Sequence, residues 1–297
     1  MKTIHFEQND IIDIKYDNVF KAVFTREGDA SRKALSKLVS ALIGREVEIV
    51  MLCVNEPPIN NLKDRQIRFD INCITENNER VNVEMSLYPK TYEPVRLEFY
   101  SGVLFTRQNI SGTEKNYSDL KRSYQIAILA NERLFKDEEF YHSFEYYDPI
   151  RNVSLNGRTR IITMELCKTE KIADKPTEEM SNSELWAYYF EYLTDKEKRG
   201  KILEILEKEE GIAMANEVLM SIGKDEIEGL RLMSELKNRL DYQSERSYDI
   251  RKGREEGMAL GRQEGREEGI QEDRKYVLDL IAKGLSAEQI RQQLERG

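Results

Sequence analysis

Two stretches of alternating sequence, separated by a polar turn, constrain the fold of this chain most strongly. Residues 67–74 place an apolar side chain at every second position, and residues 81–87 do the same. The segment between them contains Asn77 and Asn78, which favour a tight turn. Strict alternation is typical of strands that bury one face. The sequence therefore predicts an antiparallel hairpin with one face on a core.

The register of this hairpin follows from its alternation, because a slip by one residue would turn the apolar side chains to opposite faces. A turn centred on Asn77 places Asn72 opposite Asn82 and Asp70 opposite Glu84. Like charges directly across a strand pair are destabilising, so the pair favours a bound cation. Carboxylate oxygens suit Mg²⁺ or Mn²⁺. The alternative from the residues alone is an exposed polar face with both carboxylates in solvent.

The first 170 residues show the mixed pattern of an α/β domain. Apolar side chains recur at helical spacing before Gly44, which is expected to end that helix. The stretch 124–130 is apolar almost throughout, which is typical of an internal strand. The expected helices cover residues 30–44 and 93–109, and the further expected strands cover residues 47–54, 124–130 and 160–167.

The remainder of the chain is expected to be helical, with a helical region over residues 171–248 and a tail over residues 249–297. Within the tail, glycines recur every four residues among Arg and Glu, at positions 253, 257, 261, 265 and 269. One interpretation is a flexible charged spacer, because glycine is a poor helix former. The other is a long helix whose glycines let a second helix approach closely, which predicts homo-oligomers through the tail.

The tail ends in a pattern typical of two short helices. Residues 276–281 have an apolar face, and Lys283 and Gly284 end that segment. Ser286 and Gln289 then match a capping box at the start of a second helix. This pair is compatible with part of a DNA-binding helix-turn-helix and equally with any αα-hairpin.

Composition excludes several classes of function. The net charge of −9 argues against a non-specific polyanion binder, although most of the acidic excess lies after residue 167. The three cysteines are far apart, which disfavours a disulfide framework or a cysteine metal site and favours the cytoplasm. No apolar run is long enough for a membrane span. With two histidines in the chain, any catalysis is expected to depend on carboxylates.

The order of four short elements resembles the PD-(D/E)xK nuclease superfamily. Asp70 on one strand is followed after a turn by residues 84–86, which stand at the E-x-Q/K position. Upstream, residues 17–21 are similar to a D-x-x-F-K element, and residues 96–100 match an R-x-x-x-Y helix. This order over residues 10–170 is similar to the recombination-promoting nuclease (Rpn) and transposase branch of that superfamily.

The resemblance implies a restriction-endonuclease-like core, a mixed sheet flanked by helices, followed by the helical region and the glycine-punctuated tail. It also implies metal-dependent hydrolysis of DNA phosphodiester bonds, associated with recombination or transposition. Asp70 and Glu84 would then hold Mg²⁺ or Mn²⁺. Asp17 is a candidate further acid and Lys21 a candidate phosphate-binding cation. The alternative for Asp17 and Lys21 is an ordinary surface ion pair one helical turn apart.

One departure concerns the lysine of the superfamily motif, because that position is Ser86 here. A serine hydroxyl supplies no positive charge. The cation would come from Arg68, which the register places opposite Ser86, or from Lys21 or Lys90. If it is absent, the protein would be a slow or inactive nuclease.

Two further hypotheses on function remain open from the sequence. A catalytically impaired nuclease fold could act as a DNA-binding or assembly module, which Ser86 and the acidic charge favour. A transposase that performs strand transfer is the other, and no residue separates strand transfer from hydrolysis. Arg96 and Tyr100 lie one helical turn apart and are expected either to contact DNA phosphates or to pack on the sheet.

Overall fold

The computed structural model describes residues 11–56, 68–108, 116–155 and 157–294. The chain forms two compact units, of which the first ends at Ser234 and the second begins at Glu235. The strands are β1 (Ile49–Leu52), β2 (Ile71–Thr75), β3 (Arg80–Ser86), β4 (Ser123–Leu129), β5 (Tyr141–Phe144), β6 (Tyr147–Asp148), β7 (Val153–Ser154) and β8 (Thr159–Glu165). The helices are α1 (Asp17–Thr25), α2 (Asp29–Ile43), α3 (Glu93–Thr106), α4 (Glu170–Ala173), α5 (Asn182–Tyr192), α6 (Arg199–Lys208), α7 (Glu210–Ser221), α8 (Lys224–Ala282) and α9 (Ala287–Leu294).

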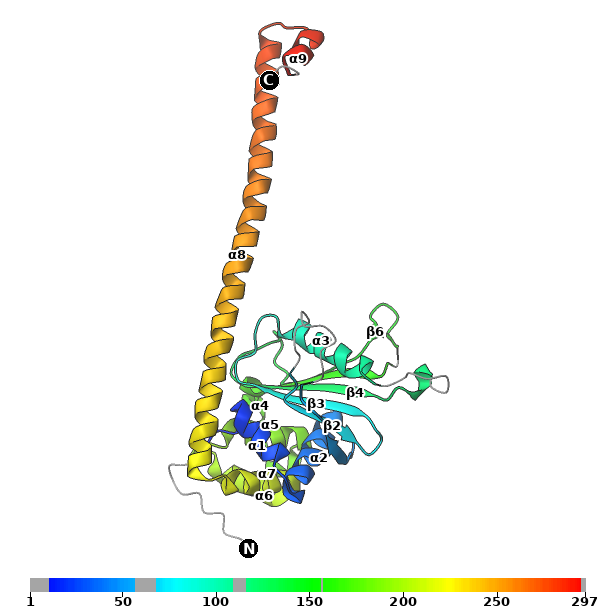
Figure 1. Ribbon diagram of the computed structural model, residues 1–297, viewed down its shortest axis with the longest axis vertical. Coiled ribbons are helices and arrows are strands. Elements are labelled where there is room, and N and C mark those ends of the chain that lie inside the picture. The colour runs from blue at the N-terminus through cyan, green and yellow to red at the C-terminus, as the bar shows by residue number, and fades with distance from the viewer. Residues whose placement is uncertain (1–10, 57–67, 109–115, 156, 295–297) are drawn as a thin grey trace. The chain divides into compact units, whose positions relative to one another are not determined.

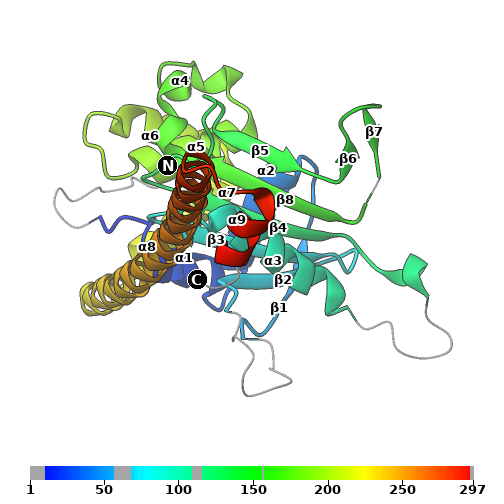
Figure 2. The same cartoon turned by 90° about the horizontal axis from the view of Figure 1, so that it is seen from above.

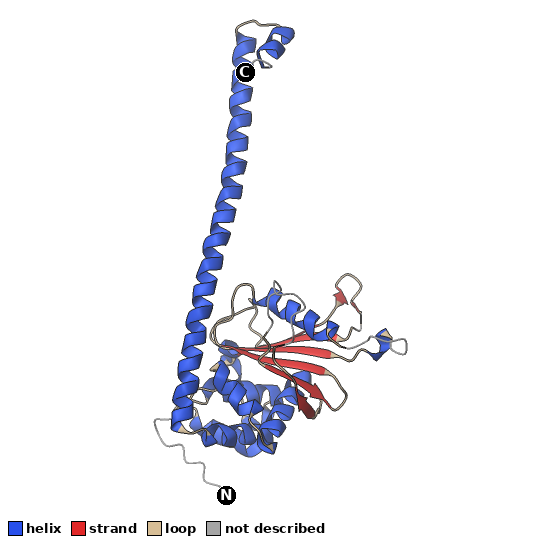
Figure 3. Cartoon of the chain, in the orientation of Figure 1, coloured by secondary structure: helices blue, strands red, loops and turns tan. Residues whose placement is uncertain are grey.

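A mixed six-stranded sheet organises the first unit, with the strand order β1-β2-β3-β4-β8-β5. The neighbouring strands β3, β4 and β8 are parallel. Strand β2 pairs antiparallel with β3, β5 pairs antiparallel with β8, and β1 pairs antiparallel with β2. Figure 2 shows β1 and β5 at the two edges of the sheet. Figure 3 shows the sheet flanked by helices, so the α/β class predicted from the sequence is confirmed.

The two faces of the sheet are covered by different helices. In Figure 1, α3 lies over one face, and α1, α2, α5, α6 and α7 gather beneath the other. Every residue of β4 is buried, as predicted for an internal strand. Helix α2 ends where Gly44 takes a left-handed conformation with φ of 82° and donates its N–H to the Ser40 carbonyl. Glycine suits this cap because it carries no Cβ.

The hairpin formed by β2 and β3 has the register predicted from the sequence. Asn72 pairs with Asn82, and the turn contains Asn78 with φ of 59°. Asparagine tolerates the left-handed conformation better than most residues, which explains its place in this turn. Strand β2 starts at Ile71, later than the expected start, and Ile67 lies outside the described residues.

The helices after residue 170 share one hydrophobic core with the first two helices of the chain. Trp186 of α5 contacts Phe24 of α1 with ring centroids 5.9 Å apart, and Phe190 lies at the same centroid distance from Phe20. Helix α7 approaches α2 so closely that a Cβ at Gly211 would overlap the side chain of Lys37. These contacts determine where α1 lies under the sheet.

The glycine repeat lies inside one continuous helix. Helix α8 covers 59 residues, from Lys224 to Ala282, which favours the interpretation as a long helix over a flexible spacer. Apart from the glycine's chain neighbours and the nearby backbone of the same helix, no heavy atom of the described chain lies within 4 Å of a Cβ built on any glycine of the repeat. Beyond Gly284, which has φ of 77°, the Ser286 N–H donates to Gln289 Oε1 2.9 Å away, as a capping box predicts before α9. No described helix combines the length and apolar character needed to cross a membrane.

Candidate active site

The β2–β3 hairpin brings two acidic side chains to the same face of the sheet. Glu84 lies on β3, and Asp70 lies immediately before β2, one position beyond the last backbone pair, Ile71 with Val83. Both residues are buried, with 7% of Asp70 and 2% of Glu84 exposed. The alternative of two carboxylates in open solvent is therefore wrong, and both charges must be balanced inside the protein.

Helix α1 supplies the cation next to Asp70. Lys21 Nζ lies 2.8 Å from Asp70 Oδ1 and 3.1 Å from Asp17 Oδ1. Asp17 and Lys21 are one helical turn apart on α1, whose apolar side packs into the core through Phe20 and Phe24. Lys21 therefore joins two carboxylates that are far apart in the sequence. This is more than the local surface ion pair that the spacing alone allowed.

Helix α3 supplies the cation next to Glu84. Arg96 Nη2 lies 2.8 Å from Glu84 Oε2 and 2.8 Å from Glu93 Oε1. The Arg96 guanidinium also lies 5.3 Å from the centre of the Tyr100 ring. That ring packs edge-on against the Phe69 ring, with the two ring centroids 5.5 Å apart. Because Phe69 directly precedes Asp70, Tyr100 packs against the segment that holds this carboxylate. Burial works against the charged guanidinium, but Glu84 and Glu93 together hold the pKa of Arg96 above its usual value.

Burial and neighbouring negative charges raise the pKa of Glu84. Burial is the largest cause that raises its pKa, and the charges of Asp70 and Glu93 add to the rise. Arg96 and a hydrogen bond from Asn82 act in the opposite direction, and the resulting pKa is about 7. A carboxyl group with a pKa near neutrality is common at functional sites, because such sites bury like charges close together.

Two buried amide side chains, Asn82 and Gln125, form a chain of hydrogen bonds that leads to Glu84. Asn82 Nδ2 lies 3.2 Å from Glu84 Oε1 and 3.0 Å from Gln125 Oε1 on the neighbouring strand β4. Neither Gln125 nor Glu93 was predicted from the sequence to belong to the site. Gln125 could have been noticed as a polar residue in an otherwise apolar strand, and Glu93 as an acid one helical turn before Arg96.

Arg68 does not occupy the position expected from the hairpin register. It precedes β2, outside the ladder, and its Nε lies 2.6 Å from Glu56 Oε1 with 68% of the side chain exposed. Ser86 is half-buried at the end of β3, where its carbonyl accepts from the Ala130 N–H. Lys90 follows in the turn before α3, where its carbonyl accepts from Glu93 N–H. Of the residues expected to replace the motif lysine, Lys21 pairs with Asp70 through its ammonium.

These contacts define a carboxylate cluster of four acids and two bases: Asp17, Asp70, Glu84, Glu93, Lys21 and Arg96. Asp17 and Asp70 also have interactions beyond these six side chains. Within the described residues, no three His, Cys, Asp or Glu side chains form a ready-made metal cage. The cluster nevertheless suits a divalent cation, because Asp70 and Glu84 offer hard oxygen ligands on the same face of the hairpin.

The raised pKa of Glu84 predicts a pH-dependent stability in metal-free buffer with EDTA. A carboxyl whose pKa is raised by folding stabilises the fold below its ordinary pKa of 4.5, and this contribution is lost as pH rises through about 7. From pH 5 to pH 8, wild type should lose roughly 1–3 kcal/mol of unfolding free energy relative to Glu84→Gln, measured by urea denaturation. A difference between the two proteins that stays constant with pH would contradict this assignment.

Comparison with known proteins identifies the family. Residues 14–249 match the PD-(D/E)XK nuclease family transposase, a span that includes the whole carboxylate cluster. No curated protein and no solved structure matches the chain. Since the matched span covers most of the sequence, the chain belongs to the PD-(D/E)XK nuclease family of transposases, which is the family that its short elements resemble.

Proposed function

We propose that this protein is a metal-dependent DNA endonuclease that acts in recombination or transposition. Membership of the family supports a nuclease or transposition-related role. The observation that carries the finer proposal is the buried Asp70–Glu84 pair, in which the charge of Asp70 helps to raise the pKa of Glu84. Two like charges buried close together are costly in a site that only stabilises the fold, and a divalent cation offsets their repulsion.

In this proposal, Asp70 and Glu84 are the ligands of Mg²⁺ or Mn²⁺. The bound ion would lower the pKa of a water molecule and stabilise negative charge on the phosphate. The buried amides of Asn82 and Gln125 orient Glu84, since Asn82 donates to the carboxylate oxygen that Arg96 does not contact. Oriented carboxylates bind a cation with less loss of side-chain freedom.

Lys21 takes the role of the motif lysine in our proposal. The motif position, Ser86, has no charge, whereas the ammonium of Lys21 lies 2.8 Å from Asp70. Asp17 holds Lys21 from the preceding turn of α1. From this position, Lys21 would stabilise the charge that develops on the phosphate.

Arg96 and Tyr100 have a second role in the proposal, on the DNA side of the site. In the metal-free protein, Arg96 is the counter-ion of Glu84 and Glu93. A divalent cation at Glu84 would take over that neutralisation and leave the guanidinium to bind a DNA phosphate, for which its planar donors are suited. Tyr100 supports Arg96 through the contact of its ring.

Plasmid nicking tests this proposal. Wild type should nick supercoiled DNA with Mg²⁺ or Mn²⁺ but not with EDTA, and Glu84→Gln and Asp70→Asn should each lose at least about 100-fold in rate. Lys21→Ala should lose roughly 10–100-fold, and Ser86→Lys in the same chain should restore part of the loss. Arg68→Ala is the matched control, since Arg68 pairs with Glu56 outside the cluster.

Two results would overturn the proposal. The first is a rate in Glu84→Gln equal to that of wild type, which would place any cleavage elsewhere. The second is metal-independent DNA binding with no nicking by wild type, which favours the inactive DNA-binding or assembly module. Joined rather than nicked products would identify strand transfer instead of hydrolysis.

We also propose that the glycine repeat of α8 mediates homo-oligomerisation. A single helix rich in glycine is costly in water, by about 1 kcal/mol for each interior glycine. A second copy lying along the five glycines would bury backbone that is exposed in one chain. Each glycine removes a side chain that would hold the two helices apart.

Sedimentation of the full chain tests the role of the repeat. Replacing Gly257, Gly261 and Gly265 together by Ala should weaken self-association, because three methyl groups would separate the helices. Helix content should stay the same or rise, since Ala is the better helix former. Gly200→Ala, in α6, is the control. A monomeric wild type, or a triple variant that associates like wild type, would refute the proposal.

A further inference from the structure

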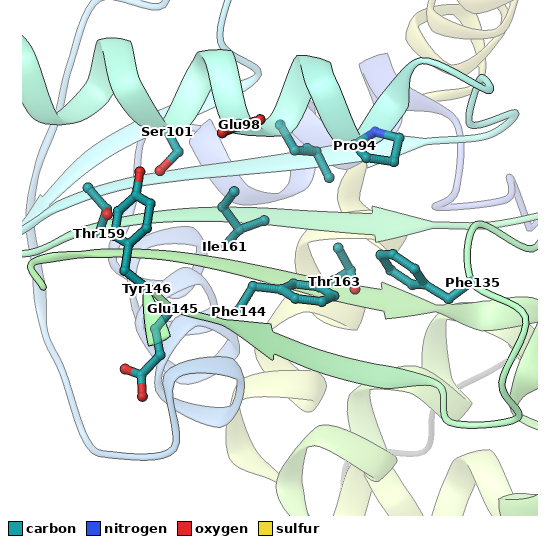
Figure 4. A pocket seen from close by; sticks show the side chains of 11 residues that line it. Pro94, Glu98, Ser101, Phe135, Phe144, Glu145, Tyr146, Thr159, Ile161 and Thr163 are labelled. Atoms are coloured by element: carbon teal, nitrogen blue, oxygen red, sulfur yellow. The ribbon is translucent and has the colours of Figure 1, made fainter. Parts of the chain in front are cut away.

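A cavity lies on the same face of the sheet as the carboxylate cluster. Its volume is about 240 Å³. Figure 4 shows its lining side chains between α3 and the neighbouring strands, which include β8. Its walls are largely apolar and include Leu97 of α3 and Ile161 of β8. Three aromatic side chains, Phe135, Phe144 and Tyr146, also line it.

The aromatic rings of this cavity are held in place yet remain partly exposed. The ring centroids of Phe135 and Phe144 are 5.2 Å apart, and the His142 ring stacks on Phe144 with an angle of 13° between the ring planes. Phe144 and Tyr146 nevertheless stay partly accessible, with exposed fractions of 41% and 56%. Pre-positioned aromatic surface of this kind suits a flat, weakly polar ring.

One polar group in the cavity is buried without a partner. Thr163 lines the cavity and is fully buried, and its hydroxyl makes no hydrogen bond within the described part of the chain. Buried hydroxyls are normally hydrogen-bonded, so an unpaired one that lines a cavity indicates a missing partner. A hydroxyl both donates and accepts, so it can pair with either edge group of a heteroaromatic ring.

Two exposed acidic residues, Glu98 and Glu145, belong to the lining of the cavity, and Glu145 pairs with Arg160 at 3.3 Å. Carboxylates repel phosphate and accept hydrogen bonds from amino groups. Glu98 therefore disfavours a phosphate in the cavity and favours a neutral ring that carries an amino group.

The cavity is close to the proposed catalytic carboxylates. Glu84 pairs with Ala127 and Ala127 pairs with Thr163 across three neighbouring parallel strands. Since strands are about 4.8 Å apart, the backbones at Glu84 and Thr163 are about 10 Å apart on one face. Helix α3 contributes to both sites, because its Arg96 pairs with Glu84 and its Leu97 lines the cavity.

We propose that this cavity binds a nucleobase with an exocyclic amino group, such as adenine, stacked against Phe144 and hydrogen-bonded to Thr163. The inference rests on the proposed function, because DNA at the carboxylate cluster would bring bases within reach. The base could belong to an unpaired nucleotide of that DNA or to a free nucleoside. Enzymes that bind extruded bases use the same combination of stacking and edge hydrogen bonds.

Binding of a duplex with one bulged 2-aminopurine tests the proposal by fluorescence, with the full chain in EDTA so that no cleavage occurs. Wild type should bind the bulged duplex at least about 5-fold tighter than the fully paired duplex, with quenched fluorescence. Thr163→Val and Phe144→Ala should lose this preference. Thr163→Val is isosteric and removes an unpaired hydroxyl, so it should fold. Phe99→Ala, an exposed aromatic of α3 outside the cavity lining, is the matched control.

A second arm uses free adenosine to distinguish the two sources of the base. Displacement of the bulged probe by adenosine, with the same loss in Thr163→Val, would support a site for the base itself. An unchanged bulge preference in both cavity variants, or none in wild type together with no adenosine binding, would overturn the proposal. Nicking of fully paired plasmid, which the cavity variants should retain, reports separately on the proposed function.

Discussion

The like charges of Asp70 and Glu84, buried on one face of a hairpin, are the constraint on which the rest of the site depends. The hairpin register brings them together, and burial prevents water from screening them. Two helices therefore contribute cations, Lys21 from α1 and Arg96 from α3. The repulsion between the two buried carboxylates is the physical basis on which we propose a divalent cation.

The position of these cations depends on packing between distant parts of the chain. Helix α1 is held under the sheet by aromatic contacts from α5, which follows it by more than a hundred residues. The close approach of α7 to α2 at Gly211 completes the same core. The helices after residue 170 thus support the carboxylate cluster indirectly, because they determine where Lys21 meets Asp70.

Local patterns predicted much of the fold, and long-range contacts account for most of what was missed. Alternation predicted the register of Asn72 with Asn82, and Gly44 predicted the end of α2, because both depend on neighbours in sequence. The contact of Lys21 with Asp70 and the inclusion of Glu93 depend on where whole helices lie. The position of Arg68 was predicted wrongly because strand β2 begins only at Ile71, after Arg68, and alternation does not show where a strand begins.

Binding of Mn²⁺ to the metal-free protein tests the central claim most directly. Titration followed by electron paramagnetic resonance counts bound ions without DNA and without turnover. We predict a tight site in wild type that is lost in Asp70→Asn and in Glu84→Gln, with circular dichroism showing that both variants fold. Equal Mn²⁺ binding in all three proteins, or none in wild type, would contradict the role of the buried pair as a cation site.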